Sequence, residues 1–208
     1  MASTTAVVSV ALEGITDEPV AEKLLAHAGA RIGRIHGGTG KDDLRRRLPG
    51  FAAAANHAPW LVMVDLDDDF SCAPELRASW VATPPPRHLC FRVPVRTVEA
   101  WLLADAHGLA RFLRVPEATI PTEPEKLARP KRALVDLSAR SSSREMREAM
   151  QPRPGSGREV GPLFPSKVIE FAREHWSVAR AAKRSDSLAR AVRCIERLVA
   201  GSQPPGPR

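Results

Sequence analysis

The chain has 208 residues and a formal net charge of +7, and 43% of its residues are hydrophobic, enough to bury the core of one domain. No apolar stretch is long enough to cross a bilayer, and three scattered cysteines without a CxxC pair argue against a disulfide framework or a zinc ribbon. We therefore expect a cytoplasmic protein without a membrane partner, whose basic charge favours a polyanion such as nucleic acid.

The first half of the chain alternates between strand and helix patterns. Short apolar, β-branched runs predict buried strands at 5–12, 31–35, 60–65 and 88–93. Helical patterns are predicted to begin at Thr16 or Asp17 and to cover 41–55, 70–80 and 97–113. This alternation is typical of βαβ units, so we expect an α/β fold with a parallel sheet and helices on both faces.

The second half of the chain is more polar and is punctuated by proline. Here the sequence predicts helical pieces over 116–150, a glycine- and proline-rich loop over 151–162, and helices at 165–176 and 178–199 with a break near 184–187.

These patterns divide the chain into three parts. An α/β core is expected over 1–115, and a helical extension packed on that core is expected over 116–200. The remaining segment, 201–208, is expected to be disordered because it is a terminus rich in Gly and Pro.

A run of carboxylates follows the predicted strand at 60–65. In an extended chain Asp65 and Asp67 point to the same side, because side chains alternate along a strand. Clustered carboxylates repel one another unless a cation lies among them, and magnesium prefers oxygen ligands. The alternative is a solvated acidic turn, in which Asp68 and Asp69 cap the next helix.

A second acidic pair follows the first strand, where Glu13 ends the strand and Asp17 lies at the start of a helix. The carboxyl ends of parallel strands lie along one edge of the sheet, where ligands bind, so both acidic groups are expected there. Glu99 lies in the first turn of a later helix. Simpler interpretations remain open, since Asp17 can be a helix cap, Glu13 a solvated residue and Glu99 a partner of the helix dipole.

Four segments taken together resemble the Toprim domain, namely LEGITDEPVAEKLL, GGTGKDDL, DLDDD and VEAWLLAD. In that domain a strand ends in Glu-Gly with an Asp soon after, and a later strand ends in DxD. Topoisomerases, primases and the OLD-type (overcoming lysogenization defect) nucleases share this fold. The chain is most similar to the nuclease branch, and to an uncharacterised bacterial Toprim-like family that lacks the ATPase half of the OLD-type proteins.

The resemblance covers roughly residues 5–115, and GPLFPSKVIEFA at 161–172 also has the character of the family. One departure concerns the last motif. The nuclease branch carries Ser where this chain reads RTVE, so Thr97 stands beside Glu99 in place of that Ser.

The resemblance implies a Toprim-like core that performs a phosphodiester reaction with Mg²⁺ or Mn²⁺. The implied metal ligands are Glu13, Asp17, Asp65, Asp67 and Glu99. Glu13 would act as general acid or base, or as one of these ligands, and Lys41 and Lys167 are the candidates for a basic residue at the scissile phosphate.

The implied function is a nuclease in a bacterial (phage) defence or DNA-repair system, acting on DNA more readily than on RNA. A protein partner such as an ATPase, or a second copy of the chain, is compatible with this role. The alternative is a non-catalytic Toprim-like module that binds nucleic acid or regulates a partner. A receiver-like phospho-acceptor domain ranks last, because it needs a lysine after a later strand and RVPVRTVE has none there.

Overall fold

A four-stranded parallel sheet forms the centre of the molecule, whose computed structural model describes residues 5–201. Its strands follow the order β2-β1-β3-β4 and comprise β1 (Ala6–Leu12), β2 (Ala30–Gly37), β3 (Trp60–Met63) and β4 (Leu89–Arg92). All four predicted strands are confirmed. The second is longer than predicted, because β2 pairs with β1 from Ala30 as far as Gly37.

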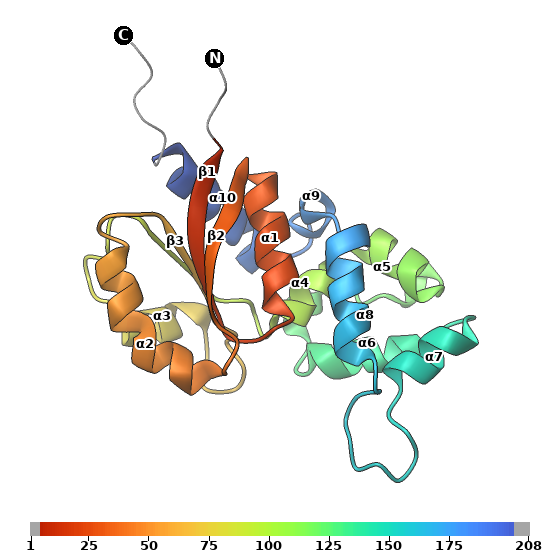
Figure 1. The fold of residues 1–208 in the computed structure, drawn as a ribbon. Helices are drawn as coiled ribbons and strands as arrows, with labels where there is room; N and C mark the ends of the chain where they lie inside the picture. The colour runs from red at the N-terminus through yellow and green to blue at the C-terminus, as the bar shows by residue number, and fades with distance from the viewer. Residues whose placement is uncertain (1–4, 202–208) are drawn as a thin grey trace.

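Helices cover both faces of this sheet, as predicted (Figure 1). The surrounding helices of the core are α1 (Asp17–His27), α2 (Lys41–Ala54) and α3 (Ala73–Trp80). On one face, Leu44 and Leu48 of α2 and Leu76 of α3 pack against alternate residues of the strands. On the other face, Leu24 and Leu25 of α1 pack in a second cluster that continues into the helical extension.

The structure divides the predicted helix at 97–113 into α4 (Val98–Ala104) and α5 (Ala106–Leu113). The break is at Asp105, whose side chain is fully buried and accepts a hydrogen bond from the amide of Gly108. Asp105 also accepts hydrogen bonds from the amide of Ser177 and from the Arg180 guanidinium. These contacts satisfy a buried charge that a continuous helix would leave without partners.

The helical extension contains η1 (Glu117–Thr119), η2 (Pro124–Lys126), α6 (Pro130–Ala139), α7 (Arg144–Met150), α8 (Phe164–Glu170), η3 (Phe171–His175), α9 (Val178–Ala181) and α10 (Asp186–Ala200). The predicted helix at 165–176 is α8 continued by the π-helical turn η3. The predicted break near 184–187 is confirmed, because α10 begins after Ser185, which caps it through the amide of Leu188. Disorder is predicted for 201–208. Residues 202–208 lie outside the described part of the chain, and Gly201 is an exposed turn.

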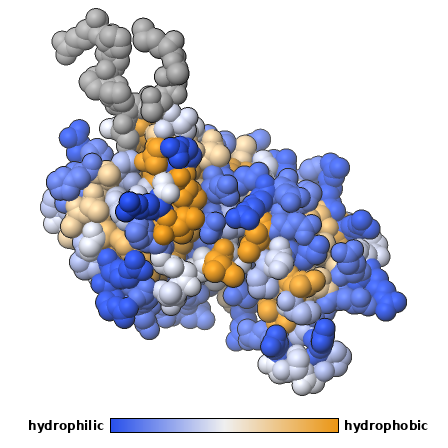
Figure 2. Space-filling view, in the orientation of Figure 1, coloured by the Kyte–Doolittle hydropathy of each residue, from blue (hydrophilic) through white to orange (hydrophobic). Residues whose placement is uncertain are grey.

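A hydrophobic strip crosses the face of the molecule seen in Figure 2, over β1 and β2, between more hydrophilic helices. Val7 and Ile35 are 41% and 47% exposed. Among residues 5–201, no helix combines the length and the apolar character needed to cross a membrane.

Candidate functional site

Hydrogen bonds join three segments at the carboxyl edge of the sheet. Glu13 directly follows β1, and its Oε2 atom accepts a hydrogen bond from the Asp65 amide at 3.2 Å. Asp65 lies two residues after β3, and its Oδ1 atom accepts a hydrogen bond from the Val98 amide at 3.0 Å, at the first turn of α4. The two acidic motifs therefore lie at one edge of the sheet, as predicted, and the start of α4 lies there with them.

Two further carboxylates of the predicted set are buried at this edge. Asp17 is the first residue of α1, is 5% exposed, and accepts a hydrogen bond from the Gly14 amide at 2.8 Å. Glu99, in the first turn of α4, is 3% exposed. Both side chains are thus withdrawn from water, whereas a simple helix cap or dipole partner is usually solvated.

The electrostatics show that these carboxylates lie close enough to repel one another. Burial raises the pKa of Asp17 to about 7, and the charges of Glu13 and Glu99 contribute in the same direction. Burial likewise raises the pKa of Asp65 well above its ordinary value, with further contributions from Asp17 and Glu99. Burial also raises the pKa of Glu13, although Lys41 opposes this shift. Each shift has the sign expected where carboxylates share a site that contains too little positive charge.

Asp67 lies in a different environment from Asp65. Strand β3 ends at Met63, and Asp67 has a left-handed backbone with φ of 51°, so the predicted extended geometry through Asp67 is wrong. The Asp67 side chain is 43% exposed, and its Oδ2 atom lies 2.6 Å from the ammonium of Lys41. The same ammonium lies 2.8 Å from Asp69, and Asp68 pairs with Arg96 at 3.1 Å. Neither aspartate caps the next helix, because the N-cap position of α3 is Cys72.

A glycine-rich turn brings Lys41 to this edge. The Gly38 and Gly40 amides donate to the carbonyls of Leu12 and Glu13 at 3.0 and 3.1 Å, so the turn lies against the end of β1. Gly37 has a φ of 99°, and a Cβ atom there would lie 1.9 Å from the Leu12 carbonyl oxygen. Only glycine permits this close approach, which sets the start of α2 beside the acidic residues.

The donor chemistry of the site fits a hard divalent cation, although the described arrangement is not a preformed coordination shell. Carboxylate oxygens of Glu13, Asp17, Asp65 and Glu99 are ligands that Mg²⁺ and Mn²⁺ prefer. The Oγ1 atom of Thr97 is buried beside them and has no hydrogen-bond partner among the residues that the structure describes. Across residues 5–201, however, no group of three or more His, Cys, Asp or Glu side chains is already arranged to hold an ion.

Basic residues of the helical extension face this acidic edge across a groove of about 390 Å³. Its core side includes Asp67, Asp68, Arg96 and Thr97, and its other side includes Arg129, Lys131, Arg132 and Glu159. The Lys131 ammonium lies 3.8 Å from a carboxylate oxygen of Glu99, so the two parts of the chain are also linked by charge. This basic wall was not predicted from the sequence, where its signal is the run Arg-Pro-Lys-Arg at 129–132.

Comparisons with models of known protein families, with curated proteins and with solved structures found no match to this chain. The interpretation of the site therefore depends on its own residues, and the Toprim resemblance stays a prediction.

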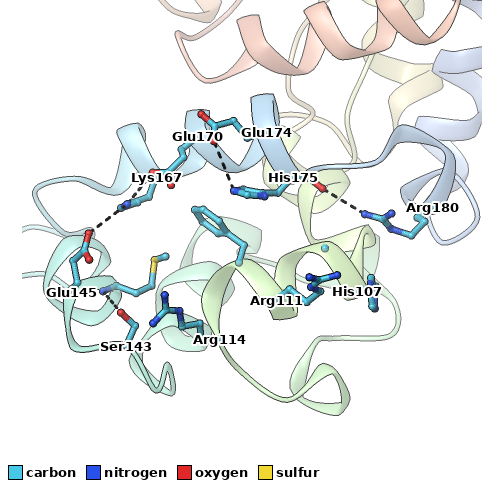
Figure 3. Close-up of a pocket in the computed structure, with 13 residues that line it drawn as sticks. His107, Arg111, Arg114, Ser143, Glu145, Lys167, Glu170, Glu174, His175 and Arg180 are labelled. Carbon is cyan, nitrogen blue, oxygen red and sulfur yellow. Dashed lines mark hydrogen bonds and ion pairs between the residues drawn. The ribbon is translucent and has the colours of Figure 1, made fainter.

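Lys167, the second predicted basic residue, lies in another cavity, of about 610 Å³, within the helical extension (Figure 3). Its ammonium is 2.9 Å from Glu170 and 3.9 Å from Glu145. The structure thus brings Lys41 to the acidic edge and places Lys167 among helices α7 and α8 with carboxylate partners of its own.

Proposed function

We propose that the chain is a metal-dependent enzyme that cleaves phosphodiester bonds of nucleic acid, on a core of the Toprim type. The observation that supports this most strongly is the convergence of Glu13, Asp17, Asp65 and Glu99 at the carboxyl edge of a parallel sheet. Buried carboxylates that repel one another destabilise a fold unless a counterion lies among them, and such groups are frequent at functional sites. A divalent cation would be that counterion.

In this proposal Mg²⁺ or Mn²⁺ would be held by oxygen atoms of Asp17, Asp65 and Glu99 and, as one of two alternatives for its role, of Glu13. The bound ion would polarise a phosphate oxygen and lower the pKa of a water molecule. The protein supplies the rest of the chemistry. Glu13 would serve either as a ligand of the ion or as the group that accepts or releases a proton, and the Lys41 ammonium would orient a phosphate oxygen.

The proposed substrate is DNA, bound in the groove between the core and the extension. Arg129, Lys131 and Arg132 line one side of this groove, next to the acidic edge. Cationic side chains of this kind bind phosphates and position a nucleic acid, whereas single-strand binding also uses aromatic stacking. No aromatic side chain within residues 5–201 lines the groove, which favours recognition of the backbone.

We further propose a cytoplasmic role in bacterial defence or DNA repair, alone, as a homodimer, or with a partner ATPase. The net charge of +7 supports a polyanionic substrate, and the described helices are too short or too polar to cross a membrane.

One observation favours a second candidate function, a nucleic-acid-binding module without catalytic turnover. Lys41 already pairs with Asp67 and Asp69, and a lysine can take the place of a cation among carboxylates. In that case the basic groove would bind DNA, and the acidic edge would be a structural element.

Manganese calorimetry combined with a plasmid-nicking assay separates the two candidates. The wild type is compared with the double variant Asp65→Asn/Glu99→Gln, and with Glu148→Gln as a control that removes an exposed carboxylate of α7. The enzyme proposal expects manganese binding and nicking in the wild type and the control, and neither in the double variant. DNA binding that is independent of metal, without nicking, would support the binding module instead.

A further inference from the structure

A third charged cavity, of about 280 Å³, lies at the edge of the sheet formed by β4, between α3 and α10. Strand β4 is the edge strand here, since its only strand neighbour in the described sheet is β3. Three guanidinium groups line the cavity, from Arg77 of α3, Arg92 of β4 and Arg190 of α10. No Asp or Glu within residues 5–201 is among the lining residues, and because Arg190 is paired with Asp186, the positive charge of the cavity comes mainly from Arg77 and Arg92.

Two of these arginines have donors that are not used. The Nε atoms of Arg77 and Arg92 are buried, and neither has a hydrogen-bond partner in the part of the chain that the structure describes. A buried donor without a partner destabilises a protein, and such groups are rare in native structures. Two such donors on arginines that line one cavity could be satisfied by an acceptor that enters the cavity.

The positive charge of these arginines also affects the pKa of a cysteine, Cys194. A hydrogen bond from Cys90 lowers the pKa of Cys194 to about 6, against the effect of burial. The charges of Arg92, Arg197 and Arg77 lower it further. The charges of Arg77 and Arg92, which line the cavity, thus act on Cys194 as well.

We propose that this cavity is an anion site that binds a phosphate group, either free or carried by a mononucleotide. Guanidinium groups match phosphate oxygens in charge and shape, and the fork of an arginine donates two parallel hydrogen bonds to them. Arg77 and Arg92 are the principal donors, and Arg190, which pairs with Asp186 at 2.8 Å, lines the cavity from α10. This site contains cations where the proposed metal site contains carboxylates, so it binds phosphate without a metal.

The test is calorimetric titration of the full chain, in EDTA, with inorganic phosphate, thymidine 5′-monophosphate and unphosphorylated thymidine. We expect saturable phosphate binding, with affinity reduced about tenfold by Arg77→Gln or Arg92→Gln, because each removes a charge-assisted hydrogen bond. The matched control is Arg31→Gln. Arg31 is an exposed arginine on β2, at the other edge of the sheet, so its loss removes the same charge but should not change the affinity for phosphate. Tighter binding of the monophosphate than of inorganic phosphate would identify a nucleotide as the source, and equal binding would identify free phosphate.

A second measurement reads out the place of binding. In a Cys72→Ser background, which removes the exposed thiol, bound phosphate should slow alkylation of Cys194 at pH 7 by disfavouring its thiolate.

The proposal is overturned if phosphate does not saturate the protein by about 10 mM, a very weak affinity. Binding of thymidine equal to that of its monophosphate, or equal phosphate affinity in wild type and Arg77→Gln, would overturn it as well. If Arg92→Gln does not fold, Arg77→Gln decides the matter. Helix α3 packs on the core through the buried residue Leu76, so a substitution at Arg77 should leave the fold intact. Since no metal takes part, Asp65→Asn/Glu99→Gln should bind phosphate like the wild type.

Discussion

The ammonium of Lys41 lies 2.6 Å from the Asp67 carboxylate, an ion pair that connects the first turn of α2 to the loop after β3. The Lys41 side chain is only 16% exposed. This partial burial lowers the pKa of Lys41, but hydrogen bonds to Asp67 and Asp69 outweigh it and raise the pKa above its ordinary value. Lys41 therefore stays charged at neutral pH, and a divalent cation at the acidic edge would compete with it for the same negative field.

Substitution of Lys41 by methionine tests this competition. We expect Lys41→Met to tighten manganese binding about tenfold, because removal of one nearby positive charge favours a cation by about 1.4 kcal/mol. DNA cleavage should fall in the same variant, since the proposed contact with a phosphate oxygen is lost. Lys167→Met is the control, because the Lys167 ammonium has its own partners in the helical extension. Weaker manganese binding in Lys41→Met would contradict a cation site beside this lysine.

Substitutions in the groove test its role as the DNA-binding surface. Each lost phosphate contact should reduce the slope of log K against log salt by about 0.9, so Arg129→Gln/Lys131→Gln should reduce it by about 1.8. The measurement is fluorescence anisotropy of a labelled duplex at several salt concentrations. Arg31→Gln, on β2, should leave the slope unchanged. Equal slopes in all three proteins would place the DNA elsewhere on the surface.

The buried carboxylate of Asp105 predicts a large effect of a substitution far from the acidic edge. Two nitrogens of Arg180 each lie 2.7 Å from the Asp105 oxygens, and Asp105 is fully buried. Arg180→Met should lower the free energy of unfolding by about 2 kcal/mol, less than for a fully buried pair, because Arg180 is 45% exposed. Urea unfolding measures this change. Arg190→Met breaks the exposed pair with Asp186 and should cost about 0.5 kcal/mol or less; equal losses in the two variants would contradict the argument.

The pair Cys90 and Cys194 predicts a pH dependence. Burial raises the pKa of Cys90, whereas the pKa of Cys194 is lowered to about 6. Iodoacetamide should therefore alkylate Cys194, in the Cys72→Ser protein, with a midpoint near pH 6 and not near about 8.5, the ordinary value for a thiol.

The same shift has a consequence for stability. Since the pKa of Cys194 is lower in the folded than in the unfolded chain, the unfolded chain binds the extra proton between these two values. The thiolate thus contributes stability above about pH 8.5, the ordinary pKa of the unfolded thiol, and this contribution is lost as the pH falls toward 6. Urea titrations should give a higher free energy of unfolding at pH 8.5 than at pH 6 in the wild type, and a smaller difference between the two pH values in Cys194→Ser. If the difference is the same in both proteins, the pH dependence comes from other groups.

The sequence predicts the sheet and the acidic edge well because both depend on local patterns. Continuous apolar runs mark strands that are buried on both faces, such as WLVM at 60–63, and parallel topology then brings their carboxyl ends together. Glu13 and Asp65 could be assigned to one edge for this reason alone.

Contacts between distant residues explain what could not be predicted. Asp105 interrupts a regular helical pattern because its partners Ser177 and Arg180 lie 72 and 75 residues away. Asp67 leaves the extended conformation for a left-handed one, which no periodicity in VDLDDD indicates. The basic wall at 129–132 reaches the acidic edge only after the extension has packed on the core.

The larger hydrophobic cluster runs without interruption from the sheet into the helices that follow residue 115. Leu24 of α1, Trp101 of α4 and Phe171 of η3 all belong to it, and each is at most 1% exposed. A chain cut at residue 115 would leave much of this surface open to water, and the hydrophobic effect would then favour aggregation over a smaller native fold. The helical extension is therefore part of the same hydrophobic core as the sheet. Its exposed surface could be redesigned, but replacing it with another helical unit would require new core residues on the face of the sheet that it covers.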